Sequence, residues 1–189
     1  MTDIYKHISQ TLKALRKERG WSLDRAAQET GVSKAMLGQI EREESSPTIA
    51  TLWKIAGGFN APFSTFITDL RADAAVSIHS SGKTKAVHPA DAKLKVFPLF
   101  PYDETLHLEI FLIELLAGCE HMSSPHKPGV IEHVIVVLGS MEVLVDGTWK
   151  TLHQGEGLRF SASQPHGYRN RTEDVAVIHD IIHYGSMYS

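Results

Sequence analysis

The sequence is poor in cysteine, in long apolar runs and in net charge. Cys119 is the one cysteine in 189 residues, which excludes an internal disulfide framework and fits a reducing compartment. No apolar run approaches the roughly 18 residues of a membrane span. The opening MTDIYKHISQ lacks the pattern of a secretory signal peptide. We therefore expect a cytoplasmic protein with no membrane partner.

The length and the distribution of charge favour two domains. Apolar residues make up 42% of the chain, enough for packed cores, and 189 residues accommodate one small and one moderate domain. The net charge of −3 hides an asymmetry: residues 1–70 hold nine Lys and Arg against eight Asp and Glu, and residues 71–189 hold ten against fourteen. Eight of the eleven histidines follow residue 100. The first part of the chain is therefore the better candidate for binding an anion.

The first 68 residues have the pattern of short, capped helices. Ser22 is placed to cap the segment LDRAAQET, Gly31 suits the left-handed position after it, and Ser33 is placed to cap KAMLGQIERE. The last of these segments has one apolar stripe, formed by Met36, Leu37 and Ile40. Two helices joined by the tight turn TGVS within a five-helix bundle predict a helix-turn-helix.

The segment WSLDRAAQETGVSKAMLGQIEREESSPTIATLWKIAGGFNAPFSTFI resembles the phage-repressor-like (XRE) family of bacterial regulators over residues 6–68. That resemblance implies that the helix after Ser33 enters the major groove of DNA. Lys34 suits guanine, Gln39 suits adenine, Ala35 suits a thymine methyl group, and Gly38 allows a close backbone approach. Phosphate contacts are expected from the remaining candidates: Ser22, Ser33, Arg16, Lys17 and Arg19.

Two departures from the family pattern lower the expected affinity for non-specific DNA. Leu23 stands where the family often has a glutamine, and the loop after the recognition helix is the acidic REESS. The family also implies a structural ion pair between Arg16 and Glu41. The alternative interpretation of this half is a helical bundle that binds protein, with Lys34 and Gln39 merely solvated.

A polar, aperiodic stretch at 69–92 predicts a linker, in which His79 and His88 are expected to be solvated. Strand-like runs follow, divided by Gly, Pro, Asp and Ser, and Asp146-Gly147 predicts a hairpin. The predicted strands are 95–100, 107–116, 132–139, 141–147, 148–152, 157–162 and 175–184. Many short strands at this spacing indicate a sandwich or a small barrel.

Two motifs in this half resemble the cupin family. The first consists of Gly118, Ser124, His126, Glu132 and Gly139. The second consists of Gly155, Ser161, Ser163, His166 and Asn170. The resemblance implies an all-α five-helix helix-turn-helix bundle (1–68), the linker, and an all-β cupin, a double-stranded β-helix barrel (93–189). The order of the two domains is similar to the sulfur-utilisation regulator group of repressor–cupin fusions.

The cupin resemblance implies that His126, Glu132 and His166 bind a divalent metal, with zinc favoured over iron or nickel. Ser124 stands where the family has a further histidine ligand, and His121 is the candidate replacement. The alternative is that no metal binds and that these side chains line a pocket for an organic ligand. The residues expected to line the effector pocket are His121, Ser124, His133, Arg159, Tyr168, His179 and His183.

These features together predict a sequence-specific transcriptional regulator. We expect a homodimer on a two-fold symmetric operator, controlled by a small-molecule effector bound to the cupin domain. The resemblance implies a sulfur-containing amino acid or a related metabolite as that effector. Two alternatives are a metal-dependent, thiol dioxygenase-like enzyme with a DNA-binding head, and a cupin domain that serves only as a dimerisation platform.

Overall fold

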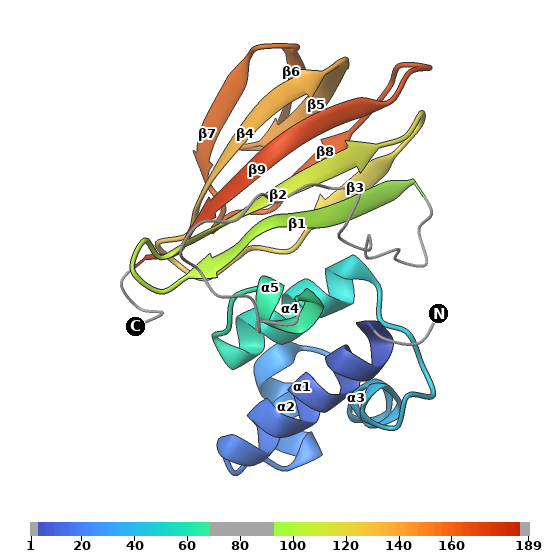
Figure 1. Ribbon diagram of the computed structural model, residues 1–189, viewed down its shortest axis with the longest axis vertical. Helices are drawn as coiled ribbons and strands as arrows, with labels where there is room; N and C mark the ends of the chain where they lie inside the picture. Colours follow the sequence, from blue (N-terminus) through green and yellow to red (C-terminus); the bar gives the residue numbers. More distant parts are fainter. Residues whose placement is uncertain (1–3, 69–92, 186–189) are drawn as a thin grey trace. The chain divides into compact units, whose positions relative to one another are not determined.

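The computed structural model describes residues 4–68 and 93–185 (Figure 1). The chain divides into two compact units, with the boundary between Val76 and Ser77. The predicted linker at 69–92, with His79 and His88, lies outside the described residues. No helix in the described part of the chain is long and apolar enough to cross a membrane.

The helical unit consists of short helices whose ends are closed by the predicted capping residues. Its helices are α1 (Ile4–Glu18), α2 (Leu23–Thr30), α3 (Lys34–Glu41), α4 (Ile49–Phe59) and α5 (Ser64–Ile67). The hydroxyls of Ser22 and Ser33 accept hydrogen bonds from the backbone N–H groups of Arg25 and Met36. Gly31 has a φ of 66°, the left-handed conformation expected between α2 and α3. The predicted caps and turn of the helix-turn-helix are confirmed.

The buried face of α3 differs at one residue from the predicted apolar stripe, because Gly38 and not Met36 lies on it. Leu37, Gly38 and Ile40 are buried, whereas Met36 is 40% exposed. A Cβ at position 38 would lie 3.7 Å from Cδ1 of Leu23, an ordinary van der Waals distance, so this side of α3 faces α2.

The second unit consists of two antiparallel sheets. Its strands are β1 (Leu94–Asp103), β2 (Leu108–Leu115), β3 (Glu120–Ser123), β4 (Ile131–Leu138), β5 (Ser140–Val145), β6 (Thr148–His153), β7 (Gly157–Ser161), β8 (His166–Arg169) and β9 (Ala176–His183). One sheet has the order β1-β2-β9-β4-β7, which Figure 1 shows side by side, and the other has the order β3-β8-β5-β6. Asp146 and Gly147 both have positive φ, which confirms the predicted hairpin between β5 and β6.

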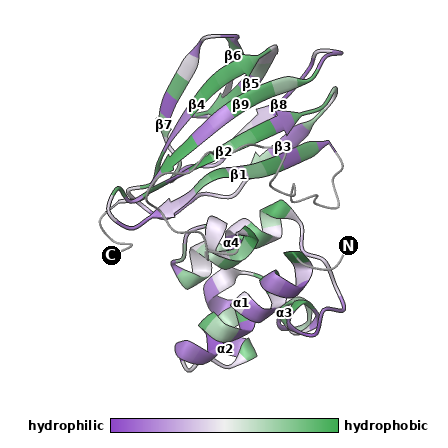
Figure 2. Ribbon diagram, viewed as in Figure 1, coloured by the Kyte–Doolittle hydropathy of each residue, from purple (hydrophilic) through white to green (hydrophobic). Residues whose placement is uncertain are grey.

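The seven predicted strands are present, but β3 and β8 were not predicted. Each of these two strands has four residues, too few for an alternating pattern to be recognised. The strands β2, β4 and β9 alternate buried and more exposed residues along most of their length. Their buried faces meet the other sheet in an apolar core that includes Phe111, Val134 and Ile178. Figure 2 shows a hydrophilic segment interrupting the hydrophobic β9.

Candidate metal centre and DNA interface

Three residues far apart in the sequence meet between the two sheets of the second unit. His126 lies in the loop between β3 and β4, where its backbone N–H donates to the carbonyl oxygen of Ala162 at 2.8 Å. Glu132 is the second residue of β4, and His166 is the first residue of β8. One ligand atom from each of the three lies within 4.8 Å of the others. The cluster therefore draws on both sheets and on one loop.

The donor set fits a divalent metal. Nε2 of His126 lies 2.8 Å from Oε1 of Glu132, and Nε2 of His166 lies 3.4 Å from the same oxygen. Nδ1 of His166 lies 2.9 Å from the carbonyl oxygen of Gln164, which only accepts, so Nδ1 carries a proton and Nε2 is the nitrogen that can bind a metal. Nε2 of His166 is buried and has no hydrogen-bond partner among the described residues. In the neutral ring the lone pair of Nε2 faces a carboxylate oxygen, an arrangement that a shared cation stabilises.

The environment keeps Glu132 ionised despite complete burial. Burial raises the pKa of its carboxyl group, but hydrogen bonds and the charges of His126 and His166 outweigh this and hold the pKa well below its usual range. Burial lowers the pKa of His166, and Glu132 more than compensates, so the pKa of His166 is raised. A buried carboxylate beside two imidazoles is the charge pattern of a cation site.

Tyr168 in β8 holds the second oxygen of this carboxylate. Its hydroxyl donates to Oε2 of Glu132, while Oε1 faces the two histidines. Burial first, and then the negative charge of Glu132, raises the pKa of Tyr168 well above its usual value, so the hydroxyl remains a donor. Tyr168 therefore leaves one carboxylate oxygen available to a metal.

Two further buried carboxyl groups were not predicted from the sequence. Glu109 in β2 accepts a hydrogen bond from the hydroxyl of Tyr184. Asp180 in β9 is 3% exposed, and its Oδ1 has no hydrogen-bond partner among the described residues. Burial, and then the charges of Glu132 and Glu109, raises the pKa of Asp180 well above its usual value. The sequence feature that could have revealed them is their spacing: Glu109 and Asp180 occupy the same alternate positions as the buried apolar residues of β2 and β9.

The residues predicted to line the effector pocket do not all face the space between the two sheets. Tyr168 faces the interior, and His121 pairs with it in the register of β3 and β8, so both lie on one face. Ser124 is half-buried in the loop after β3. His133, Arg159, His179 and His183 occupy the strand positions that alternate with buried residues, so they face away from Glu132. Their assignment to an interior effector pocket is corrected for this reason.

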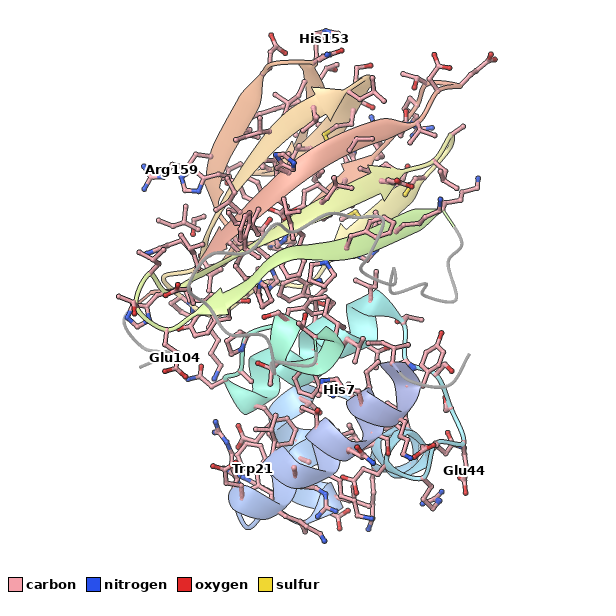
Figure 3. The ribbon with its side chains drawn as sticks, in the orientation of Figure 1. His7, Trp21, Glu44, Glu104, His153 and Arg159 are labelled. Atoms are coloured by element: carbon pink, nitrogen blue, oxygen red, sulfur yellow. The ribbon has the colours of Figure 1, made fainter. Side chains whose placement is uncertain are left out.

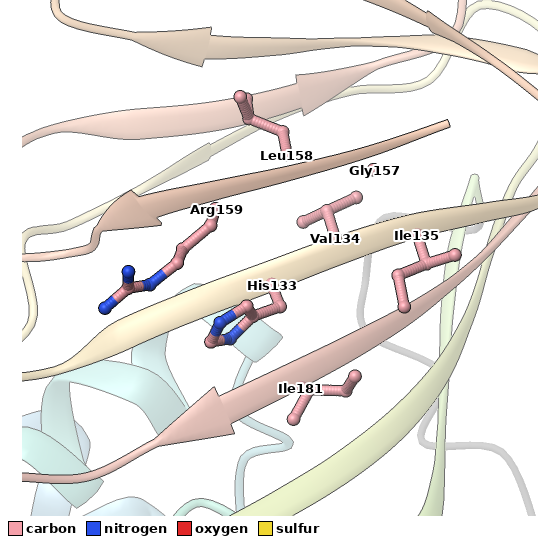
Figure 4. A pocket seen from close by; sticks show the side chains of 7 residues that line it. All are labelled: His133, Val134, Ile135, Gly157, Leu158, Arg159 and Ile181. Carbon is pink, nitrogen blue, oxygen red and sulfur yellow. The ribbon is translucent and has the colours of Figure 1, made fainter. Parts of the chain in front are cut away.

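The outward side carries a shallow groove of its own, with a volume of about 400 Å³. His133 of β4 pairs with Arg159 of β7, and Figure 4 shows the two side chains next to one another. The other lining residues are apolar or lack a side chain: Val134, Ile135, Gly157, Leu158 and Ile181. Arg159 projects away from the strands (Figure 3). This groove is separate from the His126, Glu132 and His166 cluster, because it lies on the opposite face of β4.

In the helical unit, most of the predicted DNA-contacting residues are accessible. The exposed ones are Ser22, Ser33, Lys34, Ala35, Gln39, Lys17 and Arg19. Nζ of Lys34 lies 2.8 Å from Oδ2 of Asp24, a contact between α3 and α2 that was not predicted. The guanidinium group of Arg19 lies 5.4 Å from the centroid of the Trp21 ring. The start of α3 thus presents several polar side chains to solvent.

Two of the predicted DNA contacts are corrected by the structure. Gly38 is buried, and a Cβ there would lie 3.1 Å from Nη1 of Arg42. The guanidinium of Arg16 donates to Glu41 at 2.6 and 2.8 Å and to the carbonyl oxygen of Trp21 at 2.9 Å. The hydrogen bonds from Glu41 raise the pKa of Arg16. Arg16 therefore has the structural ion pair that the family resemblance implies, and its donors are turned inwards.

Comparison with known proteins assigns both units. The family model for a helix-turn-helix matches residues 12–66, and the family model for a cupin domain matches residues 111–182. The chain is similar to the HTH-type transcriptional regulator SutR of Escherichia coli, with 50% identity over 184 residues, 97% of this chain and 98% of the relative. The HTH-type transcriptional regulator SinR of Bacillus licheniformis is 35% identical over 63 residues, 33% of this chain and 57% of that protein.

A solved structure extends the similarity to the fold. The HTH_3 family transcriptional regulator from Vibrio cholerae is 48% identical, with a TM-score of 0.83 and coverage of 96% of this chain and 97% of that one. Since these full-length relatives are regulators, the expectation of a regulator rather than a metal-dependent enzyme is confirmed. The chain belongs to the family of HTH-type transcriptional regulators that join a helix-turn-helix domain to a cupin domain.

Proposed function

We propose that this DNA-binding regulator senses a small molecule at a divalent metal held by His126, Glu132 and His166. The observation that supports this most directly is the buried cluster itself, whose ligand atoms lie within 4.8 Å of one another in the same chain as a helix-turn-helix. Two imidazoles and one carboxylate suit zinc with an open coordination position, and zinc is the favoured metal. The bound ion supplies a Lewis acid that binds an oxygen, nitrogen or sulfur atom of the effector.

The metal proposal is tested by measuring metal content. Protein purified without chelators is expected to carry about one zinc ion per chain in native mass spectrometry and elemental analysis. His166→Ala is expected to lose the metal, and His153→Ala, which changes an exposed histidine at the end of β6, is expected to retain it. Equal metal content in both variants contradicts the proposed site.

The proposed DNA contacts are Lys34, Ala35 and Gln39 at the start and on the outer side of α3. All three are exposed, and the Ser33 cap fixes the first turn of the helix beside them. Lys34→Ala and Gln39→Ala are each expected to weaken binding to a selected operator by about 1–3 kcal/mol. Lys150→Ala in β6 removes an exposed lysine of the cupin domain and is expected to have no effect. Unchanged operator affinity in both α3 variants contradicts the assignment of the recognition helix.

The proposed effector is a sulfur-containing amino acid or a related metabolite, bound between the metal and the interior side chains. Asp180 is the polar group available there, because its buried Oδ1 has no partner in the described chain, whereas the hydroxyl of Tyr168 donates to Glu132. An effector shifts DNA affinity only through its different affinities for two states of the protein. Thermal-shift screening of such metabolites with the zinc-loaded chain tests this, and no stabilisation by any of them contradicts the sensor role.

We further propose a homodimer that pairs through the outer face of the five-stranded sheet. Ile135, Val137 and Leu138 of β4 are 40%, 40% and 52% exposed on or beside this face. Each sheet carries one ion pair on its outer face, Lys95–Glu114 on this sheet and Glu142–Arg169 on the other. Five strands of about eight residues span an area of about 600 Å². That is the order required for an interface of about 800 Å² per partner.

A further inference from the structure

The first turns of α2 and α3 are joined by an ion pair in the free protein. Asp24 lies in the first turn of α2, and Lys34 is the first residue of α3. Nζ of Lys34 lies 2.8 Å from Oδ2 of Asp24, although the two side chains are 59% and 67% exposed. The pair therefore lies on the accessible surface beside the proposed DNA contacts.

The carboxylate of Asp24 lowers the attraction of DNA phosphates to the N-terminal ends of α2 and α3. The N-terminus of a helix attracts phosphate through its free N–H groups and its dipole, but at α2 a carboxylate already provides the negative charge. Asp24 also neutralises the one cation of the first turn of α3. A DNA phosphate that approaches this surface is repelled by Asp24 and has to compete with it for Lys34.

The ion pair also limits the positions that the ammonium group can reach. A lysine has a flexible stem and follows the nearest phosphate when nothing holds it. Asp24 holds Nζ of Lys34 between the first turns of α2 and α3. Contact with a base leaves this arrangement in place, whereas contact with the DNA backbone requires the lysine to leave its partner.

We propose that Asp24 is a specificity-determining residue, which weakens non-specific DNA binding more than operator binding by holding Lys34 away from the DNA phosphates. This inference rests on the proposed role of Lys34 in DNA recognition. Asp24 contacts no DNA in this scheme and acts through Lys34, so it is a positioning residue. Its removal raises affinity, in contrast to the removal of a DNA contact.

The test compares two DNA probes with the full-length protein. One is an operator duplex selected by the wild-type protein from a random library, and the other is a random-sequence duplex of equal length. Asp24→Asn is expected to raise affinity for the random duplex about three- to tenfold at low salt. It is also expected to make the slope of log affinity against log salt steeper by up to about 0.9. Operator affinity rises less, so the ratio of operator to random affinity falls.

Three further variants serve as controls for the effect of Asp24→Asn. Glu29→Gln removes a carboxylate from the other exposed ion pair of α2, that with Arg25, and is expected to change the ratio by less than about twofold. Asp24→Asn in a Lys34→Met background is expected to leave the ratio close to that of Lys34→Met alone. Asp24→Ser retains a residue suited to a helix start and repeats the result if Asp24→Asn lowers thermal stability.

An unchanged ratio in both Asp24 variants overturns the inference, as does an equal effect of Glu29→Gln. If Lys34→Ala weakens operator binding while the Asp24 variants behave as wild type, the inference alone fails and the proposed DNA contact stands. If Lys34→Ala leaves operator binding unchanged, the proposed contact itself fails, and the inference fails with it.

Discussion

Replacing Tyr168 by phenylalanine tests how the metal centre is organised. The hydroxyl of Tyr168 donates to Oε2 of Glu132, and the tyrosine is only 6% exposed. Phenylalanine fills the same space but leaves that oxygen without its donor, so the carboxylate is free to rotate away from the two histidines. Groups that orient a metal ligand typically contribute about 10–100-fold to metal affinity, which corresponds to about 1.4–2.7 kcal/mol. We expect Tyr168→Phe to weaken zinc binding by that factor without loss of the fold.

The assay is competition for zinc with a chelating indicator, together with near-UV circular dichroism as a measure of the fold. Tyr184→Phe is the matched control, since it removes the same kind of hydrogen bond, to the buried Glu109, in the same domain. It is expected to change domain stability but not zinc affinity. Zinc affinity that is unchanged in Tyr168→Phe, or equally reduced in both variants, refutes the argument that Tyr168 orients Glu132.

Three further predictions address stability, assembly and the metal ligands. Glu41→Gln leaves the guanidinium of Arg16 largely buried with its main partner removed, so we expect the helical unit to lose about 3 kcal/mol in urea unfolding followed by far-UV circular dichroism. The exposed control Glu43→Gln should change it by less than about 0.5 kcal/mol. Val137→Asp places a charge beside the exposed Ile135 and Leu138 on the outer face and should shift sedimentation from dimer to monomer, while Thr151→Asp on the other sheet should not; a dimeric Val137→Asp variant argues against this interface. Acidification from about pH 7 to about pH 5 should release zinc, because imidazole binds it only in the neutral form, and full zinc content at the lower pH contradicts histidine ligation.

The local elements were largely predictable because their causes are local. A serine oxygen reaches an N–H group three residues away, and a glycine adopts positive φ wherever the chain turns, so Ser22, Gly31 and Ser33 marked the helix ends. The Asp146-Gly147 hairpin follows the same logic. The strands β3 and β8 escaped prediction because four residues contain too few alternations to define a period.

The candidate metal cluster was predictable only through the spacing of a known motif. Neither composition nor periodicity indicates that His126 in a loop and His166 in β8 approach Glu132 of β4; the pairing of strands from two sheets brings them together. Asp180 and Glu109 stayed unrecognised because they resemble exposed residues until the facing sheet covers them. The outer position of His179 and His183 could not be decided from the sequence, because only the strand register reveals which face of β9 is covered.

The sequence by itself determined the class of protein, the capped helix-turn-helix and the cupin motifs, since these depend on residues that are close in the chain or on a fixed spacing. The tertiary structure decided which side chains are available. It turned the guanidinium of Arg16 towards Glu41, buried Gly38 against α2, and placed Asp24 beside Lys34. The physical reason is that hydrogen bonds and packing across helices and sheets join residues that are distant in the sequence, and burial strengthens such contacts where water is excluded, as at Arg16 and Glu41.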